Sequence, residues 1–253
     1  MLIDSHCHLI SSRFDSDREE VIRRALENNV KYIISVGSTI DSCKKNVELA
    51  ETYDPIYSVI GIHPHNVKNI DEETYTILKE LAKSRKVVGY GEIGLDFYRM
   101  YSPRDVQLDR FREQVEVAKE LNLPVVIHDR NAHRETFDIL KDFNTRGVIH
   151  CFSGDYELAK KFINLGFYIS IPTTVTYKKN YRLHEVVKKL PINRILIETD
   201  APALAPQAYR GKRNEPAFVK YAAEKIGKLK ELSLDDVSRF TSKNISVLFN
   251  IPY

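Results

Sequence analysis

The chain is poor in cysteine and has no long apolar run, and these absences exclude two classes of protein. Its three cysteines, Cys7, Cys43 and Cys151, are far apart and form no CxxC pair. An odd and scattered set does not provide a disulfide framework, so we expect free thiols and a cytoplasmic location. No apolar run approaches the roughly 20 residues of a transmembrane helix. The first residues, MLIDSHCHL, lack the basic and apolar segments of a secretion signal, so we expect no membrane association.

The chain also lacks a strong charge of one sign. Its 38 Lys and Arg residues against 35 Asp and Glu residues leave a net charge of +3. That is far from the field of a protein that coats nucleic acid. It does not exclude an enzyme that acts on nucleic acid, because a carboxylate-rich metal site offsets basic residues elsewhere.

The length and the apolar pattern favour one barrel. A chain of 253 residues has about the size of a single (β/α)₈ unit. Short β-branched runs alternate with amphipathic helical stretches, which indicates a parallel sheet with helices outside it. We predict one α/β domain over residues 1–253, a (β/α)8 TIM barrel with extra C-terminal helices, in preference to an open doubly wound sheet. The expected strands are 2–4, 32–36, 56–60, 87–90, 125–127, 148–149, 167–170 and 195–198. The expected helices are 17–28, 40–52, 72–84, 103–121, 134–143, 156–164, 181–189, 216–229 and 234–249.

Side chains that bind metal ions stand at the ends of several of these apolar runs. His6 and His8 form an H-x-H after the first run, and residues two apart share one face of a strand. A carboxylate or imidazole also follows four later runs, as Glu92, His128, His150 and Asp200. The carboxyl ends of parallel strands meet on one rim of a barrel, where active sites of this architecture lie. The pattern therefore predicts one shared site.

Each of these side chains also has an ordinary structural reading, such as an exposed glutamate or a core histidine with a backbone partner. Their repetition at successive strand ends favours the shared site. Four imidazoles and two carboxylates suffice for two divalent metal ions with open positions. Imidazole suits Zn²⁺, and carboxylates extend the choice to Mn²⁺ and Mg²⁺. Asp200 can also hold or deprotonate a water. Glu198 shares its face and either competes for that role or pairs with a neighbouring barrel residue.

Several rim residues are candidates for contact with substrate. His63 is the better candidate of the pair His63 and His65, and Arg210 or Arg213 can bind phosphate, unless their loop is simply solvated. Four aromatic residues can stack on bases or pack their own loops: Phe97, Tyr98, Tyr101 and Tyr209. We expect the side chains of Cys7 and Cys151 to point away from the site, and His133 and His184 to face solvent.

The chain resembles the TatD-like metal-dependent hydrolases, which belong to the amidohydrolase superfamily. The similarity rests on six strings in order along the sequence: IDSHCH at 3–8, GIHPH at 61–65, GEIGLDFY at 91–98, HCFSG at 150–154, ETDAP at 198–202 and RGKRNEP at 210–216. Two stretches depart from the family pattern, because Asn131 stands where an acidic residue is more common and residues 171–174 lack a glycine.

The resemblance implies a TIM barrel with a site of the magnesium, manganese or zinc type. It implies that His6, His8, Glu92 and Asp200 hold one ion, and that Glu92 bridges to a second ion held by His128 and His150. It further implies that Asp200 acts as the base that orients water, and that His63 and Arg213 lie near a substrate phosphate.

The function expected from the resemblance is a metal-dependent deoxyribonuclease, a 3′→5′ exonuclease on single-stranded DNA with a role in DNA repair. DNA would be its substrate, and no obligate protein partner is evident. A metal-dependent amidohydrolase or esterase, for example a D-aminoacyl-tRNA deacylase, is the alternative, because the same ions polarise a carbonyl. A non-catalytic scaffold is the third possibility, and the complete set of six ligands argues against it.

Overall fold

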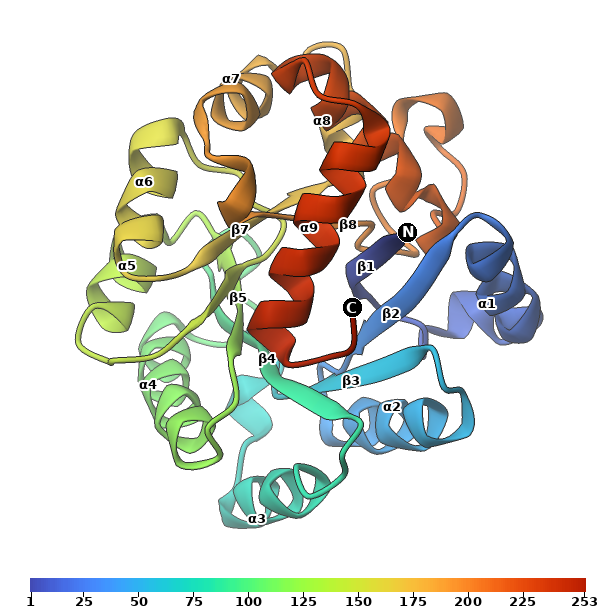
Figure 1. Cartoon of the computed structure of the whole chain (residues 1–253). Coiled ribbons are helices and arrows are strands. Elements are labelled where there is room, and N and C mark those ends of the chain that lie inside the picture. The colour runs from blue at the N-terminus through green and yellow to red at the C-terminus, as the bar shows by residue number, and fades with distance from the viewer.

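Eight parallel strands form the centre of the molecule, and each lies beside the strands that precede and follow it in the chain. The computed structural model describes residues 1–253. The strands surround a central axis, and helices lie outside them (Figure 1). The strands are β1 Leu2–Cys7, β2 Val30–Val36, β3 Ile56–Ile60, β4 Val87–Asp96, β5 Val125–Arg130, β6 Gly147–Ile149, β7 Tyr168–Pro172 and β8 Ile195–Glu198. The predicted (β/α)₈ barrel is confirmed.

Helices α1 to α7 each follow the strand of the same number, and α8 and α9 come after β8. They are α1 Arg18–Glu27, α2 Ile40–Thr52, α3 Glu72–Leu81, α4 Arg104–Glu120, α5 His133–Leu140, α6 Tyr156–Asn164, α7 Tyr181–Lys189, α8 Val219–Lys230 and α9 Leu234–Phe249. None of them combines the length and the apolar composition needed to cross a lipid bilayer. Helix α8 starts later than predicted, because Pro216–Phe218 form a separate 3-10 turn.

Strand β5 shows why the strand sequences are continuously apolar. Val126 belongs to an apolar cluster inside the barrel, whereas Val125 and Ile127 belong to the larger cluster between the strands and the helices. Successive side chains of a strand point to opposite faces, and both faces of this sheet are covered. The alternation of polar and apolar residues that marks a half-exposed strand is therefore absent.

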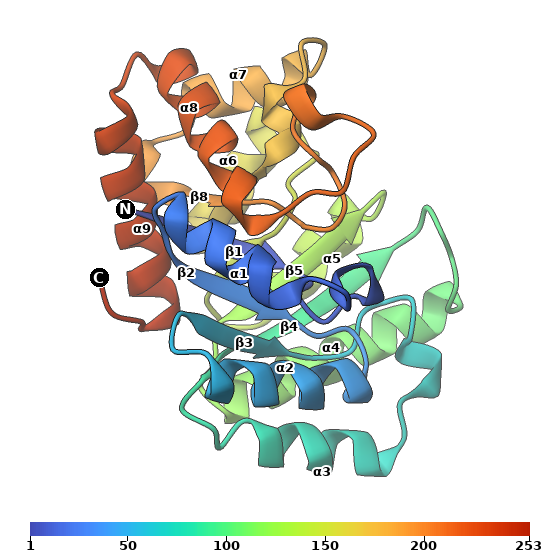
Figure 2. The same cartoon turned by 90° about the vertical axis from the view of Figure 1, so that its right-hand side faces the viewer.

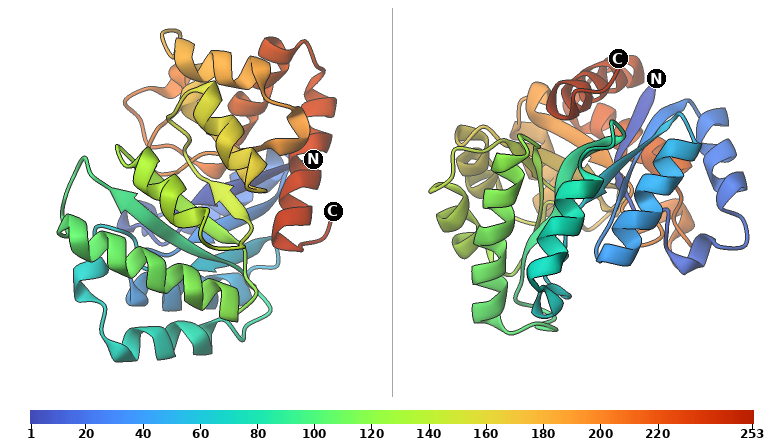
Figure 3. Two further views of the ribbon diagram at one scale, coloured as in Figure 1. Left: turned by 90° about the vertical axis from the view of Figure 1, so that its left-hand side faces the viewer. Right: turned by 90° about the horizontal axis from the view of Figure 1, so that it is seen from below.

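Helix α9 closes one end of the barrel. It lies across the end where the N-terminus begins (Figure 1), and its Phe249 packs so close to β4 that a Cβ on Gly89 would lie 3.1 Å from the ring. Side chains of α9, of Ile251 after it and of the strands form one buried cluster: Ile3, Ile34, Val36, Val59, Val88, Val126, Val148, Leu196, Ile245, Leu248, Phe249 and Ile251. The side views place α9 at this end alone (Figures 2 and 3). Access to the barrel interior is therefore left to the opposite rim.

The seam between β8 and β1 is held mainly by side chains. The only bridge between these segments joins Cys7 to Ala201. The buried carboxylate of Asp4 accepts hydrogen bonds from the backbone N of Thr199 at 2.9 Å and from its Oγ1 at 2.6 Å. The backbone N of Asp200 donates to the carbonyl of His6 at 2.9 Å. These contacts nearly close the barrel and bring the ends of β1 and β8 together.

Candidate metal centre

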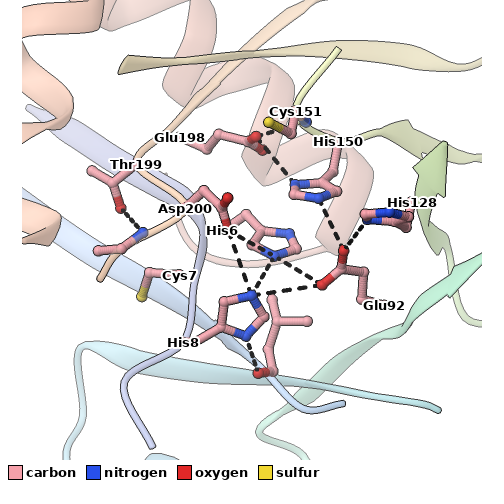
Figure 4. A network of polar contacts seen from close by, with 12 residues as sticks. His6, Cys7, His8, Glu92, His128, His150, Cys151, Glu198, Thr199 and Asp200 are labelled. Atoms are coloured by element: carbon pink, nitrogen blue, oxygen red, sulfur yellow. Dashed lines mark hydrogen bonds and ion pairs between the residues drawn. The ribbon is translucent and has the colours of Figure 1, made fainter. Parts of the chain in front are cut away.

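Glu92 lies at the centre of the polar network on the open rim. Its side chain is buried, and its two oxygens face different pairs of imidazoles (Figure 4). Oε2 lies 3.5 Å from Nε2 of His6 and 3.6 Å from Nε2 of His8. Oε1 lies 2.7 Å from Nδ1 of His128 and 3.0 Å from Nε2 of His150. This is the arrangement that a carboxylate between two cation sites requires.

Strand β4 is longer than the sequence predicts, and this places Glu92 inside the strand. The pairing with β5 continues to Asp96, with Gly94 opposite His128. Gly94 has φ of 132°, and a Cβ there would lie 2.1 Å from the carbonyl oxygen of His128. Only glycine allows the backbone to pass this close. The glycines flanking Glu92 thus let β4 run past the metal-capable residues of β5.

Strands β1 and β8 supply the other half of the centre across the seam. His6 and His8 lie two positions apart on β1, and their Nε2 atoms are 3.4 Å apart. Asp200 follows β8, and its Oδ1 lies 3.5 Å from Nε2 of His8 and 3.9 Å from Nε2 of His6. Asp200 has the left-handed φ of 57°, a conformation that aspartate adopts more readily than most residues.

The spacing of these atoms fits a divalent ion. Ligands bound tetrahedrally at about 2.0–2.2 Å from one ion are separated by about 3.3–3.6 Å. The Nε2 atoms of His6 and His8 lie 3.4 Å from each other and 3.5–3.9 Å from the nearest oxygens of Glu92 and Asp200. Two nitrogen and two carboxylate donors suit Zn²⁺ and Mn²⁺, and the carboxylates also suit Mg²⁺. The residues present therefore match the cofactor class that the sequence predicts.

His63 lies beside the second group of candidate ligands. Its Nε2 lies 3.5 Å from Oε1 of Glu92, and His63, Glu92 and His128 form one of the clusters able to hold an ion. Burial lowers the pKa of His63 to about 4, so its imidazole is neutral near pH 7, and its Nδ1 accepts a hydrogen bond from the backbone N of His65 at 3.1 Å. For His128, burial opposes protonation, but hydrogen bonds to Asp96 and Glu92 raise its pKa to about 8.

The two central carboxylates are ionised at neutral pH because imidazoles surround them. Burial alone would raise the pKa of Glu92, but His150 and the other nearby imidazoles hold that pKa well below its usual value. Burial also opposes ionisation of Asp200, and its hydrogen bond with His8 outweighs this and lowers the pKa. The centre thus carries negative charge that a cation can neutralise.

Two further carboxylates lie behind the imidazoles and orient them. Glu198 lies 3.2 Å from Nδ1 of His150 and accepts hydrogen bonds from the backbone N of Cys151 at 2.7 Å and from Ser170 Oγ at 2.6 Å. Asp96 lies 3.2 Å from Nε2 of His128. Such outer carboxylates fix the ring orientation of metal-binding histidines. Glu198 therefore pairs with neighbouring barrel residues, which was one of its two predicted roles.

The centre forms the floor of a cavity of about 840 Å³. His8, His63, His128, His150, Glu92 and Asp200 all contribute to its lining. The Asp200 side chain is 17% exposed, whereas that of Glu92 is 3% exposed. Of the two central carboxylates, Asp200 is therefore the one that a substrate or a water can reach.

Arg213 is not among the residues that line this cavity, and its place near a substrate phosphate stays a prediction. Its Nη2 and Nη1 lie 2.6 and 2.7 Å from the carboxylate of Asp17, and Nη2 lies 3.6 Å from Glu215. Its guanidinium also lies over the ring of Phe14. The basic loop folds back onto the start of α1, where the carboxylate of Asp17 pairs with Arg213.

The cavity wall includes residues that the sequence reading missed or placed elsewhere. Arg130 and Arg182 line the cavity and were not expected there. Arg130 had a signal in the sequence, since it stands two positions after His128 and shares its face of β5. Cys151 also lines the cavity, contrary to prediction, because its left-handed φ of 45° breaks the strand alternation. Cys7 is fully buried as predicted.

Two histidines expected in solvent instead make polar contacts. His133 Nδ1 lies 2.8 Å from Oδ2 of Asp129, and His184 Nε2 lies 2.7 Å from the carbonyl of Val175. Both rings are only partly exposed. His65 lines the cavity and lies 2.8 Å from Asp96. The helical sequence pattern around His133 and His184 could not reveal their partners.

Comparisons with known proteins agree with this site. The model of the family described as TatD related DNase matches residues 3–250. The metal-dependent hydrolase YabD of Bacillus subtilis (strain 168) is 43% identical over 254 residues, covering 99% of this chain and all of the relative. The metal-dependent hydrolase YcfH of Escherichia coli (strain K12) is 35% identical over 258 residues, covering 99% of this chain and 96% of the relative. The crystal structure of YjjV, a TatD homologue from Escherichia coli K12, superposes with a TM-score of 0.94 at 31% identity and covers 99% and 98% of the two chains.

Proposed function

The chain belongs to the TatD-related DNase family of metal-dependent hydrolases, and from this premise we propose that it is a deoxyribonuclease. Its reaction would be hydrolysis of phosphodiester bonds in single-stranded DNA, as a 3′→5′ exonuclease with a role in DNA repair. The observation that carries this proposal is Glu92, whose two oxygens each face a separate pair of imidazoles beside the accessible carboxylate of Asp200.

We assign the ligands by their distances from Glu92 and, for Asp200, by its distances from His6 and His8. His6, His8, Glu92 and Asp200 would hold one divalent ion, and Glu92, His128 and His150 would hold the second. Mg²⁺, Mn²⁺ or Zn²⁺ bound there would supply charge neutralisation at phosphorus and an activated water. The proposal treats residues 1–253 as one domain. A cytoplasmic location would fit the three free thiols.

Asp200 would act as the general base. Its lowered pKa keeps it ionised at neutral pH, and its partial exposure lets it accept a hydrogen bond from a water in the cavity. It would orient that water toward phosphorus and take its proton as the new P–O bond forms, while the P–O bond to the leaving 3′-oxygen breaks and that oxygen takes a proton from solvent. His63, on the cavity wall, would donate a hydrogen bond to a phosphate oxygen.

The form of the cavity supports attack at a chain end. Because α9 closes the far end of the barrel, the cavity is blind, and a strand enters and leaves by the same rim. A free end fits into such a cavity directly, whereas an internal phosphodiester reaches the floor only if the strand bends sharply. The 3′→5′ polarity itself rests on the family resemblance.

The test is a digestion series with end-labelled single-stranded DNA and each of Mg²⁺, Mn²⁺ and Zn²⁺. We expect stepwise product ladders with the wild type. Asp200→Asn removes the general base, so its turnover should be about 10²–10⁴-fold lower. Glu92→Gln removes a ligand charge and should lose activity with every ion.

Asp138→Asn is the matched control, because Asp138 is an exposed carboxylate on α5 that pairs with Lys141. It should digest DNA as the wild type does. An aminoacyl ester is assayed alongside, since hydrolysis of the ester in place of DNA would support the alternative carbonyl chemistry. Folded Glu92→Gln and Asp200→Asn proteins with full metal-dependent DNase activity would contradict the proposal.

A further inference from the structure

Arg130 lines the cavity and no carboxylate neutralises it, a combination that it shares with Arg182 and not with Arg213. It ends β5, its side chain is exposed, and its guanidinium has no ion pair within 4.0 Å. Only two permanently cationic residues line the cavity, Arg130 and Arg182. Arg213, by contrast, is held by Asp17. An unpaired guanidinium on a cavity wall can bind an anionic group through two hydrogen bonds, as a bidentate donor.

Tyr98 holds Arg130 in place without neutralising it. The guanidinium carbon lies 4.0 Å from the centre of the Tyr98 ring, a favourable cation–π distance. Tyr98 remains 57% exposed even with Arg130 beside it. Its ring therefore offers apolar surface next to the free cation.

Tyr101 offers a second ring on the same loop. It is 55% exposed, and its centre lies 4.7 Å from the ring of His65, which lines the cavity. The other aromatic candidates are covered: Phe97 packs on the apolar core and Tyr209 stacks on Phe218 at 4.3 Å. Tyr98 and Tyr101 are thus the two candidates whose rings keep exposed surface, and both Arg130 and Arg99 lie near the Tyr98 ring.

Asp96 connects this loop to the metal centre. Its buried Oδ1 accepts hydrogen bonds from the backbone N of Tyr98 at 3.0 Å and of Arg99 at 2.7 Å. Its Oδ2 lies 2.8 Å from His65 and 3.2 Å from His128. The same carboxylate therefore fixes the loop backbone and a proposed metal ligand. In the side views the loop after β4 extends on the side away from α9 (Figures 2 and 3).

We propose that Tyr98, Tyr101 and Arg130 form a platform that binds single-stranded DNA beside the scissile phosphate. Arg130 would bind a backbone phosphate, and the tyrosine rings would stack on one or two bases. Rings beside an unpaired cation are the elements by which proteins hold single strands without reading their sequence. The proposal rests on the proposed nuclease function and names how that site holds its substrate.

The test measures binding of a fluorescein-labelled phosphorothioate oligo(dT), which resists hydrolysis, to the metal-loaded protein by fluorescence anisotropy. Tyr98→Ala and Tyr101→Ala should each weaken binding about fivefold or more, from the loss of a stacked base. Tyr98→Phe keeps the ring and should bind as the wild type does. Arg130→Gln should weaken binding and reduce the slope of log affinity against log salt by about 0.7, as expected for one lost phosphate contact.

Two exposed residues outside the cavity provide matched controls. Tyr253 is 54% exposed, and Arg134 is 90% exposed on α5. Tyr253→Ala and Arg134→Gln should leave the affinity within twofold of the wild type. With a probe whose sugars carry no bases, the deficits of the tyrosine variants should disappear, and that of Arg130→Gln should persist.

Binding and cleavage separate the two proposals. If the wild type cleaves DNA and the Tyr98→Ala and Arg130→Gln proteins bind with unchanged affinity, the platform is refuted and the nuclease function stands. If no divalent ion supports cleavage but binding depends on Tyr98 and Arg130, the platform stands and the nuclease function fails. A wild type that does not bind the probe refutes the platform directly.

Discussion

Replacement of Gly94 by alanine should destabilise the protein and disturb the metal centre together. Its φ of 132° is a region that residues with a Cβ rarely adopt, which costs about 1–3 kcal/mol. The new Cβ would also lie 2.1 Å from the carbonyl oxygen of His128. That oxygen is backbone and must move with its strand, and such overpacking costs a further 1–3 kcal/mol or so.

Gly166 is the matched control for the backbone contribution. It also has a positive φ, of 93°, but a Cβ there would have no neighbour within 4 Å. Gly166→Ala should therefore show the conformational cost alone. The difference between the two variants isolates the contact with His128, and we expect it to be about 1–3 kcal/mol.

The assay is urea unfolding of both variants and the wild type, with thermal melts as a second measure. A difference of 1 kcal/mol corresponds to a shift of roughly 2–4 °C in a chain of this size. Because His128 must move with its carbonyl, Gly94→Ala should also lower the affinity for Mn²⁺, whereas Gly166→Ala should not. Equal destabilisation by the two substitutions, with equal Mn²⁺ affinity, would refute the reasoning.

Two further predictions concern charge. Adding Mn²⁺ to EDTA-treated protein should stabilise it by about 2.7 kcal/mol when the free Mn²⁺ concentration is a hundred times the dissociation constant. Glu92→Gln should abolish most of the accompanying rise in melting temperature. A full rise in that variant would argue against Glu92 as a ligand. The pKa of Asp17 is lowered to about 2, chiefly by Arg213, so the ion pair stabilises the fold above pH 3.8 and its contribution disappears as the pH falls through 2. The stability difference between wild type and Arg213→Gln should follow that course, and a difference independent of pH would show that the arginine acts by packing alone.

Much of the barrel could be predicted because its signals are local. The runs at 56–60 and 195–198 were located to the residue, and the helices after them follow from apolar spacing along a few turns. The end of β4 could not be predicted in the same way. Its pairing with β5 extends to Asp96 because Gly91 and Gly94 let β4 pass close to Val126 and His128. That contact depends on a strand more than thirty residues later in the chain, as the pairing of Asp96 with Arg130 illustrates.

The candidate ligands could likewise be named from their types and positions, and the structure brings all six together around Glu92. The sequence could not predict whether a given arginine is paired with a carboxylate. Arg213 and Arg130 both follow proposed ligands in rim segments, yet one is neutralised by Asp17 and the other is not. Nothing near either arginine in the sequence distinguishes them.

The sequence by itself determined the alternation of strands and helices and the kinds of side chain at the strand ends, because both are properties of neighbouring residues. Only the tertiary structure decided which carboxylate meets which imidazole or guanidinium. Asp4 accepts hydrogen bonds from Thr199, and Glu198 is paired with His150. A buried charge must find a partner wherever the folded chain supplies one, and closure of the barrel brings that partner from the other end of the sequence.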